Sequence, residues 1–431
     1  MKNLIYMPRI IDKTLREHLD SSGAVLISGP KWCGKTTTAK QQAESLLEMQ
    51  DPDRTSEYLA TAAVKPSLLL DGENPRLLDE WQIAPVLWDA VRTAVDRRNE
   101  TGLFILTGST TVDESQIMHS GTGRISRLTM YPMSLYESGE SNGTISLNDL
   151  FNKPEMDIDG IKTDLSIEKL VFAACRGGWP SSLNRKTDKA ILSEAQKYIS
   201  NICNSDASTV DGIKRSSTRV KAVLQSYARN ISTPATNKTI LGDLSANYAE
   251  ISEPTLLSYI NALERLFVIE DIPAWCPAIR SATTIRSGKK RGFTDPSIAV
   301  GSLALSPDVL LRDMLTFGFI FENLCTRDLK IYSSSMGGYV SYYRDRFNLE
   351  ADCVLHLADG RYALIEFKLG SSGIEEGVKH LLELKQLIQK ANTEKRAKLR
   401  EPDLLIVVTG GEMAYTRNDM VKIIPIGCLC D

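Results

Sequence analysis

Uninterrupted apolar runs that stop at small, hydroxyl or acidic residues recur in the N-terminal third of the chain. The runs are Val25–Ile27, Leu77–Leu78 and Leu103–Leu106. Runs of this kind are typical of strands buried on both faces of a parallel sheet. Apolar residues at helical spacing predict a leading helix over Arg9–Leu19, and a second helix is expected from Lys35 to about Met49. The pattern predicts an α/β domain with parallel strands.

The stretch from Val25 to Thr38 joins an apolar strand, a glycine-rich loop and a helix-forming run. The loop reads G-x-x-x-x-G-K-T, and its place between strand and helix makes it a phosphate-binding loop. Glycines let successive N–H groups turn towards an anion, and the helix N-terminus adds partial positive charge. The alternative, a chance glycine turn, is disfavoured by both flanks. The residues predicted to hold a nucleotide are Gly29, Pro30, Lys31, Trp32, Cys33, Gly34, Lys35, Thr36 and Thr37.

ATP and Mg²⁺ are the cofactors that such a loop predicts. Lys35 is expected to reach the β- and γ-phosphates, and the Thr36 hydroxyl to bind Mg²⁺. A P-loop ATPase also requires a strand that ends in an acid. Asp79 is expected to complete the Mg²⁺ shell, and Glu80 to orient the attacking water. The alternative is an acidic helix cap before Trp81.

Further polar residues follow the next apolar strands. Thr107 and Ser109 stand at a carboxyl end, where ligands of open parallel sheets bind. Each is a candidate to sense the γ-phosphate or hold the water, and each also suits a plain strand exit. Arg124 or Arg127 is a candidate to neutralise charge on the transferred phosphoryl group, in cis or across a subunit interface. A solvated surface arginine is the alternative for both.

Several strings together resemble the AAA-type, STAND-related ATPases of bacteria and archaea. They are GPKWCGKTT, RLLDEWQ, FILTGST and GRISRLTMYPMSLYE, and Gly177–Pro180 resembles the GG-aromatic-Pro turn usual after that ATPase core. The resemblance implies an AAA/ASCE-type parallel sheet, followed by a C-terminal domain of unknown function. It extends more weakly over almost the whole chain.

Composition is that of an ordinary globular protein. The chain has 431 residues, 42% hydrophobic and 24% charged, which suggests several domains. A net charge of −3 and a pI of about 6.0 do not indicate a globally basic nucleic-acid binder. No apolar run approaches the ~20 residues that span a bilayer, and the N-terminus lacks a signal peptide's apolar core. Eight cysteines without a C-x-x-C pair suit a reduced compartment, so a cytoplasmic location without membrane contact is expected.

The middle of the chain shows helix, turn, helix and strand over residues 239–272. Ser252 and Pro254 suit the start of the second helix. This order predicts a winged helix, which the resembling family also has at this place. The second helix carries only Arg265 as a base. The other basic residues lie where a wing is expected, and they are Arg280, Arg286, Lys289, Lys290 and Arg291. They are either phosphate contacts or part of a solvated loop.

The last third resembles restriction-endonuclease-like (PD-(D/E)XK) nucleases. Thirteen residues separate Asp352 from Glu366-x-Lys368, and alternation places Glu366 and Lys368 on one strand face. Glu322, on a preceding helix, resembles the extra acid of such folds. Converging carboxylates hold a divalent metal that polarises a phosphodiester and activates water, and the lysine orients that water or stabilises charge. The alternative is a degenerate nuclease fold kept as a docking platform.

The sequence thus predicts a P-loop NTPase domain, a winged-helix segment and a restriction-endonuclease-like α/β domain. The boundaries are 1–145 for the ATPase, 146–205 for a linker and helical segment, 206–300 for the helical and winged-helix domain, and 301–431 for the nuclease-like domain. Residues 142–164 are polar and suit a linker or exposed insertion. The expected function is a Mg²⁺-dependent ATPase coupled to a nuclease-like domain that acts on nucleic acid. The alternative is an ATP-dependent signalling switch or scaffold whose inactive nuclease-like domain binds a protein partner.

Overall fold

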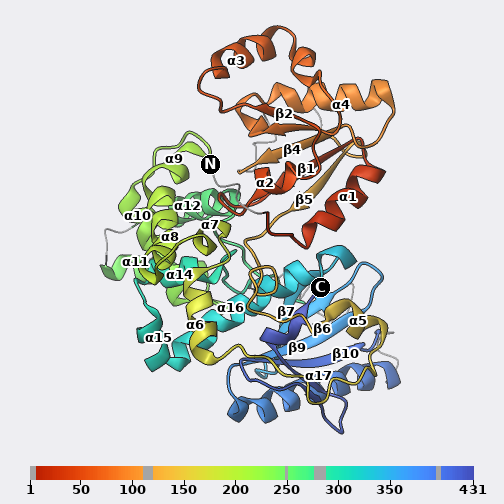
Figure 1. Ribbon diagram of the computed structural model, residues 1–431. Coiled ribbons are helices and arrows are strands. Elements are labelled where there is room, and N and C mark those ends of the chain that lie inside the picture. The colour runs from red at the N-terminus through yellow and green to blue at the C-terminus, as the bar shows by residue number, and fades with distance from the viewer. Residues whose placement is uncertain (1–5, 110–119, 248–250, 276–287, 395–398) are drawn as a thin grey trace. The chain divides into compact units, whose positions relative to one another are not determined.

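The computed structural model describes residues 6–109, 120–247, 251–275, 288–394 and 399–431 (Figure 1). The chain divides into two compact units. The first comprises Met1–Pro132, Asp206–Lys214 and Asn261–Val268, and the second comprises Met133–Ser205, Arg215–Ile260 and Ile269–Asp431. Among the residues described, none of the helices combines the length and apolar composition that crossing a bilayer requires.

A five-stranded parallel sheet forms the centre of the first unit, in the order β2-β3-β4-β1-β5. The strands are β1 (Ala24–Ser28), β2 (Ser45–Glu48), β3 (Arg76–Asp79), β4 (Phe104–Gly108) and β5 (Ile125–Thr129). β4 therefore lies between β1, which leads into the phosphate loop, and β3, which ends at Asp79. The predicted parallel α/β domain is confirmed.

Two hydrophobic cores border the strands of this sheet. The helices of this part are α1 (Ile11–Ser21), α2 (Lys35–Ala39), α3 (Thr55–Val64) and α4 (Val86–Arg98), with 3-10 turns η1 (Pro66–Leu70) and η2 (Trp81–Ile83). Alternate residues of β1 enter the two cores, because side chains alternate along a strand. Val25 and Ile27 share a core with α1, and Leu26 shares the other core with α3 and α4.

The helix after the phosphate loop is shorter than the sequence predicts. α2 ends at Ala39, and Ser45–Glu48 form the edge strand β2, which pairs with β3. Leu47 is buried whereas Leu46 is exposed, as suits the edge of a sheet. The helix predicted to reach Met49 is wrong at its end, because pairing with β3 overrides the local helical pattern.

The middle of the chain is largely helical, as Figure 1 shows in yellow and green. Its elements are α6 (Ile167–Arg176), α7 (Pro180–Leu183), α8 (Asp188–Asn201), η4 (Ile202–Asp206), α9 (Ala207–Thr209), α10 (Ser217–Arg229), α11 (Asn237–Asn247), α12 (Glu253–Arg265), α14 (Pro296–Ser302) and α15 (Pro307–Arg312). Helices expected near residues 167–175 and 188–202 are confirmed.

The segment after α12 folds back in two antiparallel bridges, Ile269 with Phe293 and Ile272 with Lys290. Arg280 and Arg286 lie outside the described residues. Of the described basic residues of the expected wing, Lys289 is exposed, whereas Lys290 and Arg291 are buried. For these two, the solvated-loop reading is wrong, because each side chain is held in buried ion pairs.

The C-terminal part is built on a six-stranded mixed sheet in the order β11-β12-β10-β9-β8-β7. Its elements are α16 (Met314–Tyr332), η5 (Ser334–Met336), β7 (Tyr339–Arg344), β8 (Glu350–His356), β9 (Tyr362–Lys368), η6 (Ser371–Gly373), α17 (Ile374–Thr393), β10 (Leu404–Thr409), β11 (Tyr415–Thr416) and β12 (Lys422–Pro425). β7, β8 and β9 are antiparallel neighbours, and β10 lies parallel between β9 and β12. Both α16 and α17 pack against this sheet. The helix–hairpin–strand–helix order expected here is confirmed.

Residues 142–164 carry more order than an exposed linker would. β6 (Ile145–Ser146) pairs in parallel with β13 (Leu429–Cys430), which follows η7 (Ile426–Cys428), and α5 (Leu147–Asn152) follows β6. Five apolar side chains of this stretch are buried, namely Ile145, Leu147, Leu150, Phe151 and Ile158. The many polar residues between them hide this signal in the sequence. The predicted four-part division of the chain stays a prediction.

Candidate nucleotide-binding site and the C-terminal acidic residues

The phosphate loop turns tightly at its two glycines. Gly29 has φ +152°, and a Cβ there would lie 2.1 Å from the carbonyl oxygen of Met130. Gly34 has φ +106°, and it immediately precedes α2. Since both values fall in the region that favours glycine, the two glycines of the motif are required by the backbone path.

Lys35 bends back over the start of its own loop. Its ammonium Nζ donates hydrogen bonds to the carbonyl oxygens of Gly29 at 2.9 Å and Pro30 at 2.8 Å. The residue is only 6% exposed. The charge therefore lies beside the loop backbone, where a phosphate group would be held.

Residues from three neighbouring elements meet at Asp79. The Thr36 hydroxyl from α2 donates to Asp79 Oδ1 at 2.7 Å, and the Thr107 hydroxyl from β4 donates to the same oxygen at 2.5 Å. The sheet order makes this meeting possible, because β4 separates β1 from β3. Hydroxyl and carboxylate oxygens are the ligands that Mg²⁺ prefers, so these residues fit a magnesium ion.

Glu80 stands beside this group in an unusual backbone conformation, with φ +53° and ψ +46°. A non-glycine residue in the left-handed region costs about 1 kcal/mol or more, and such strain is concentrated at functional sites. The Glu80 carboxylate accepts hydrogen bonds from Gln82 Nε2 and, at 3.2 Å, from Ser109 Oγ. Although Glu80 precedes η2, its side chain caps no backbone N–H there. This geometry disfavours the alternative of an acidic helix cap.

Several other loop residues have structural partners within the first unit. Lys31 Nζ lies 2.7 Å from Asp206 Oδ1, and the buried Cys33 thiol faces the Met130 carbonyl at 3.5 Å. Trp32, which also has positive φ, is 41% exposed. Thr37 is exposed, and its backbone oxygen accepts a hydrogen bond from the Gln41 side chain. A role for these four residues in nucleotide binding stays a prediction.

Arg9 is a supporting residue that sequence reasoning missed. Its guanidinium donates to the carbonyl oxygens of Cys33 and Tyr131, each at 2.9 Å. It therefore joins the phosphate loop to the segment that follows β5. No motif marks this arginine, because its partners are backbone atoms distant in sequence.

The two candidate arginines lie away from the loop. Arg124 precedes β5, and its carbonyl pairs with the N–H of Ala24 at the start of β1, whereas the phosphate loop follows the end of β1. Its side chain pairs with Asp96 at 2.7 Å. Arg127 lies over the Trp88 ring, 5.3 Å from its centroid. Arg124 thus lies at the amino ends of the strands, whereas the phosphate loop lies at their carboxyl ends. It therefore does not suit contact with a phosphate held by its own chain.

The four predicted nuclease residues fall into two groups. Glu366 and Lys368 on β9 form an ion pair of 2.9 Å, and His380 Nδ1 of α17 lies 3.5 Å from Glu366 Oε1. Glu322 on α16 and Asp352 on β8 instead share Lys290, at 2.6 Å and 3.5 Å. Over the described ranges, no three His, Cys, Asp or Glu residues are arranged to hold a metal ion. The predicted metal set of Glu322, Asp352 and Glu366 stays a prediction. The three carboxylates lie close enough to affect one another's ionisation, but each of them pairs with a lysine, Lys290 or Lys368.

Burial shapes the ionisation of these groups. Loss of solvent raises the pKa of Glu366 to about 7, and the nearby Asp352 carboxylate adds to the rise. Burial alone would lower the pKa of Lys290, but the carboxylates of Glu322 and Asp352 outweigh it and leave that pKa above its usual value. Lys290 is therefore a charged ammonium at neutral pH. Neither oxygen of Glu366 accepts a well-aligned hydrogen bond from the described residues.

The Gly177–Pro180 turn belongs to a buried charged network of the second unit. Asp295 Oδ2 accepts the Gly178 N–H at 2.9 Å and the Arg327 guanidinium at 2.8 Å. Arg327 also pairs with Asp328 at 2.7 Å, and Asp328 Oδ2 accepts the Leu135 N–H at 3.0 Å. Packing and charge thus account for the motif residues of this region.

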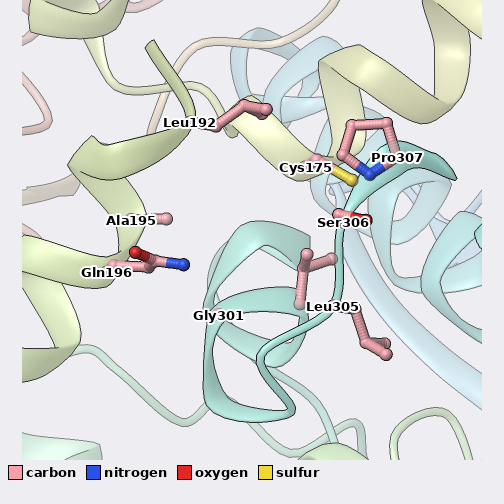
Figure 2. Close-up of a pocket in the computed structure, with 9 residues that line it drawn as sticks. Cys175, Leu192, Ala195, Gln196, Gly301, Leu305, Ser306 and Pro307 are labelled. Carbon is pink, nitrogen blue, oxygen red and sulfur yellow. The ribbon is translucent and has the colours of Figure 1, made fainter. Parts of the chain in front are cut away.

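A small cavity of about 110 Å³ lies among the helices of the same unit (Figure 2). Leu192, Ala195 and Gln196 of α8 line one side, and Cys175 and Pro307 lie on the other. The lining residues carry no charge. The cavity therefore offers no chemistry related to the phosphate loop or to the C-terminal acids.

The parallel sheet, the phosphate loop and the Asp79–Glu80 pair define a P-loop ATPase domain. In agreement, residues 21–139 match the family described as AAA domain. This part of the chain is therefore similar to AAA-type P-loop ATPase domains. Residues 167–309 and 317–429 match two domains of unknown function, DUF8612 and DUF4143.

Relatives and solved structures add context. Uncharacterized proteins of Mycobacterium bovis and Mycobacterium tuberculosis are each 21% identical over 413 residues, covering 95% of this chain and 82% of theirs. A Walker-type ATPase of Pyrococcus abyssi is 15% identical, with a TM-score of 0.40, over 68% of this chain and 94% of that one. A STAND protein with a tetratricopeptide repeat sensor from Pyrococcus horikoshii is 13% identical, with a TM-score of 0.25, over 78% and 49%. Because both TM-scores are below 0.5, the resemblance to P-loop ATPases rests on the match of residues 21–139 and on the phosphate loop itself.

Proposed function

We propose that this chain binds ATP together with Mg²⁺ and hydrolyses it. The observation that carries the proposal is the pair of hydrogen bonds that Asp79 accepts from Thr36 and Thr107. These two bonds bring α2, β3 and β4 together at Asp79, next to Glu80. ATP hydrolysis by a P-loop domain requires these groups at one sheet edge.

Each residue has a distinct role in this proposal. The loop N–H groups and Lys35 bind the β- and γ-phosphates, and the oxygens of Thr36 and Asp79 hold the Mg²⁺ shell. When bound, Mg²⁺ neutralises charge on the phosphate oxygens. Glu80 accepts a proton from the water that attacks the γ-phosphorus, and ADP and inorganic phosphate are released.

Thr107 and Ser109 act through the two acids. Because Thr107 donates to Asp79 and Ser109 donates to Glu80, we assign both as positioning residues. This assignment replaces a γ-phosphate sensor as the role of Thr107. Gln82 joins Ser109 in orienting the Glu80 carboxylate.

Nucleotide binding with and without Mg²⁺ tests the first part of the proposal. Lys35→Ala is expected to weaken ATP binding at least about tenfold, whereas Lys65→Ala, at an exposed lysine of the same unit, serves as the control. Thr36→Val is expected to remove the gain in affinity that Mg²⁺ gives to the wild type. Equal ATP affinity of wild type and Lys35→Ala would contradict the proposed site.

For the rest of the chain we favour the switch over the nuclease. The C-terminal domain has the expected order of elements but no assembled carboxylate set among its described residues. Two of the described wing residues, Lys290 and Arg291, form buried ion pairs with acids of the same unit. This leaves less positive charge to contact a nucleic-acid phosphate backbone. We therefore propose that nucleotide binding controls docking of a protein partner.

The salt dependence of binding separates the two partner classes. Contacts with nucleic-acid phosphates weaken steeply as salt rises, since each releases counterions. We expect no measurable affinity for single- or double-stranded DNA or RNA in fluorescence anisotropy at low salt. An affinity that falls steeply with salt would favour nucleic acid as the partner.

A further inference from the structure

Lys290 brings a positive charge into the acidic group that the nuclease resemblance reserves for a divalent metal. Its ammonium Nζ lies 2.6 Å from Glu322 Oε1 and 3.5 Å from both Oδ1 and the backbone oxygen of Asp352. It also lies 5.3 Å from the centroid of the Tyr342 ring. Oxygens and an aromatic face thus surround one cation.

The position of this lysine is fixed from both sides. Its backbone N–H and C=O both pair with Ile272, at 2.9 Å and 2.8 Å. The Tyr342 hydroxyl donates to the Gly288 carbonyl at 2.6 Å, and Arg291 forms a buried ion pair with Asp271. With Lys290 only 5% exposed, its side chain is part of the core rather than a mobile surface group.

Each of the three carboxylates already has a lysine as its charged partner in this arrangement. Asp352 Oδ1 faces Lys290, and its Oδ2 accepts the Phe367 N–H at 3.0 Å. Glu366, the third expected ligand, pairs with Lys368 instead. A divalent cation would have to displace an ammonium or stand beside it, and like charges at such distances repel strongly at a buried site. The residues present therefore do not fit the metal that the resemblance implies.

We propose that Lys290 is the permanent counter-ion of Glu322 and Asp352, and that the C-terminal domain consequently binds no divalent metal at this place and cuts no phosphodiester bond. The Lys290 ammonium supplies the positive charge that a bound metal ion would otherwise supply. This inference is independent of the ATPase activity, because it concerns only residues of the second unit.

Mn²⁺ titration of the nucleotide-free full-length chain, followed by electron paramagnetic resonance, tests the inference. All proteins carry Thr36→Ala, so that the phosphate loop contributes no metal site. The parent and its Asp352→Asn variant are expected to bind Mn²⁺ identically. Lys290→Met is expected to gain a site at least about tenfold tighter than any in the parent, and Lys290→Met with Asp352→Asn to lose that site again.

Lys289→Met is the matched control, since this neighbouring lysine is exposed, and it is expected to behave like the parent. A parent site that Asp352→Asn abolishes would overturn the inference, and so would a folded Lys290→Met protein without added Mn²⁺ affinity. If Lys290→Met does not fold, the inference is tested by comparing Mn²⁺ binding of the parent with that of its Asp352→Asn variant. Plasmid cleavage with Mn²⁺ provides the second readout, because cleavage by the parent that Asp352→Asn removes would also overturn the inference.

Discussion

Replacing Arg327 by methionine is expected to destabilise the second unit strongly. Arg327 is the cation between the carboxylates of Asp295 and Asp328, and both carboxylates are fully buried. Methionine keeps most of the volume but leaves two buried charges without their cation. Breaking a buried ion pair by removing one partner typically costs about 3–5 kcal/mol.

The remaining contacts set the magnitude within this range. Asp295 still accepts hydrogen bonds from Gly178 and Ser297, and Asp328 still accepts one from Leu135. These bonds reduce the penalty, but none of them supplies positive charge. We therefore expect a loss of about 3 kcal/mol or more at neutral pH. The deficit should shrink as the pH falls, because protonation removes the stranded charges.

Urea denaturation followed by circular dichroism measures the loss, and hydrogen exchange localises it. The Gly178 and Leu135 amides are expected to exchange faster in Arg327→Met than in wild type. Arg312→Met, at an exposed position of the same unit, is expected to stay within about 0.5 kcal/mol of wild type. If Arg327→Met unfolds at the same urea concentration as this control, the account of the network is refuted.

Three further predictions concern other parts of the chain. Because burial raises the pKa of Glu366 to about 7, its ionisation destabilises the fold as the pH rises through that value. Glu366→Gln should therefore gain up to about 3 kcal/mol over wild type between about pH 5 and about pH 8 in urea denaturation, and an unchanged difference across this range would contradict the burial effect. Gly29→Ala places a methyl group against the Met130 carbonyl, so titration with a fluorescent ATP analogue should show at least about a tenfold weaker affinity, and unaltered affinity would mean that the loop tolerates a Cβ. Arg124→Ala removes the exposed pair with Asp96 and an exposed hydrogen bond to the Thr122 carbonyl, so kcat should stay within about twofold of wild type at low protein concentration, and a large loss that appears only at high concentration would reveal a role in trans.

Features set by short stretches of sequence could be predicted well. The G-x-x-x-x-G-K-T loop is local, since its glycines, Lys35 and the flanking strand and helix lie within fifteen residues. The strands buried on both faces of a sheet could also be predicted, because an uninterrupted apolar run is compatible with few other structures. In contrast, the helix expected up to Met49 gave way to an edge strand whose partner, β3, lies about thirty residues further on.

Features that depend on distant contacts were not predictable. Lys290 reads as a wing residue in the sequence, yet its partners Glu322 and Asp352 follow 32 and 62 residues later. Arg9 contacts backbone oxygens that no residue type announces. The motif around Arg124 predicts a place near the nucleotide, and only the strand register shows that Arg124 lies at the amino end of β1, away from the phosphate loop.

Release of phosphate from ATP by wild type and Glu80→Gln tests the central claim most directly. The account predicts Mg²⁺-dependent release by wild type and a loss of about 10²–10⁴-fold in Glu80→Gln, with ATP affinity nearly unchanged. Glu73→Gln, at an exposed acid of the same unit, should match wild type. Equal release by wild type and Glu80→Gln, or no release by wild type, would contradict the account.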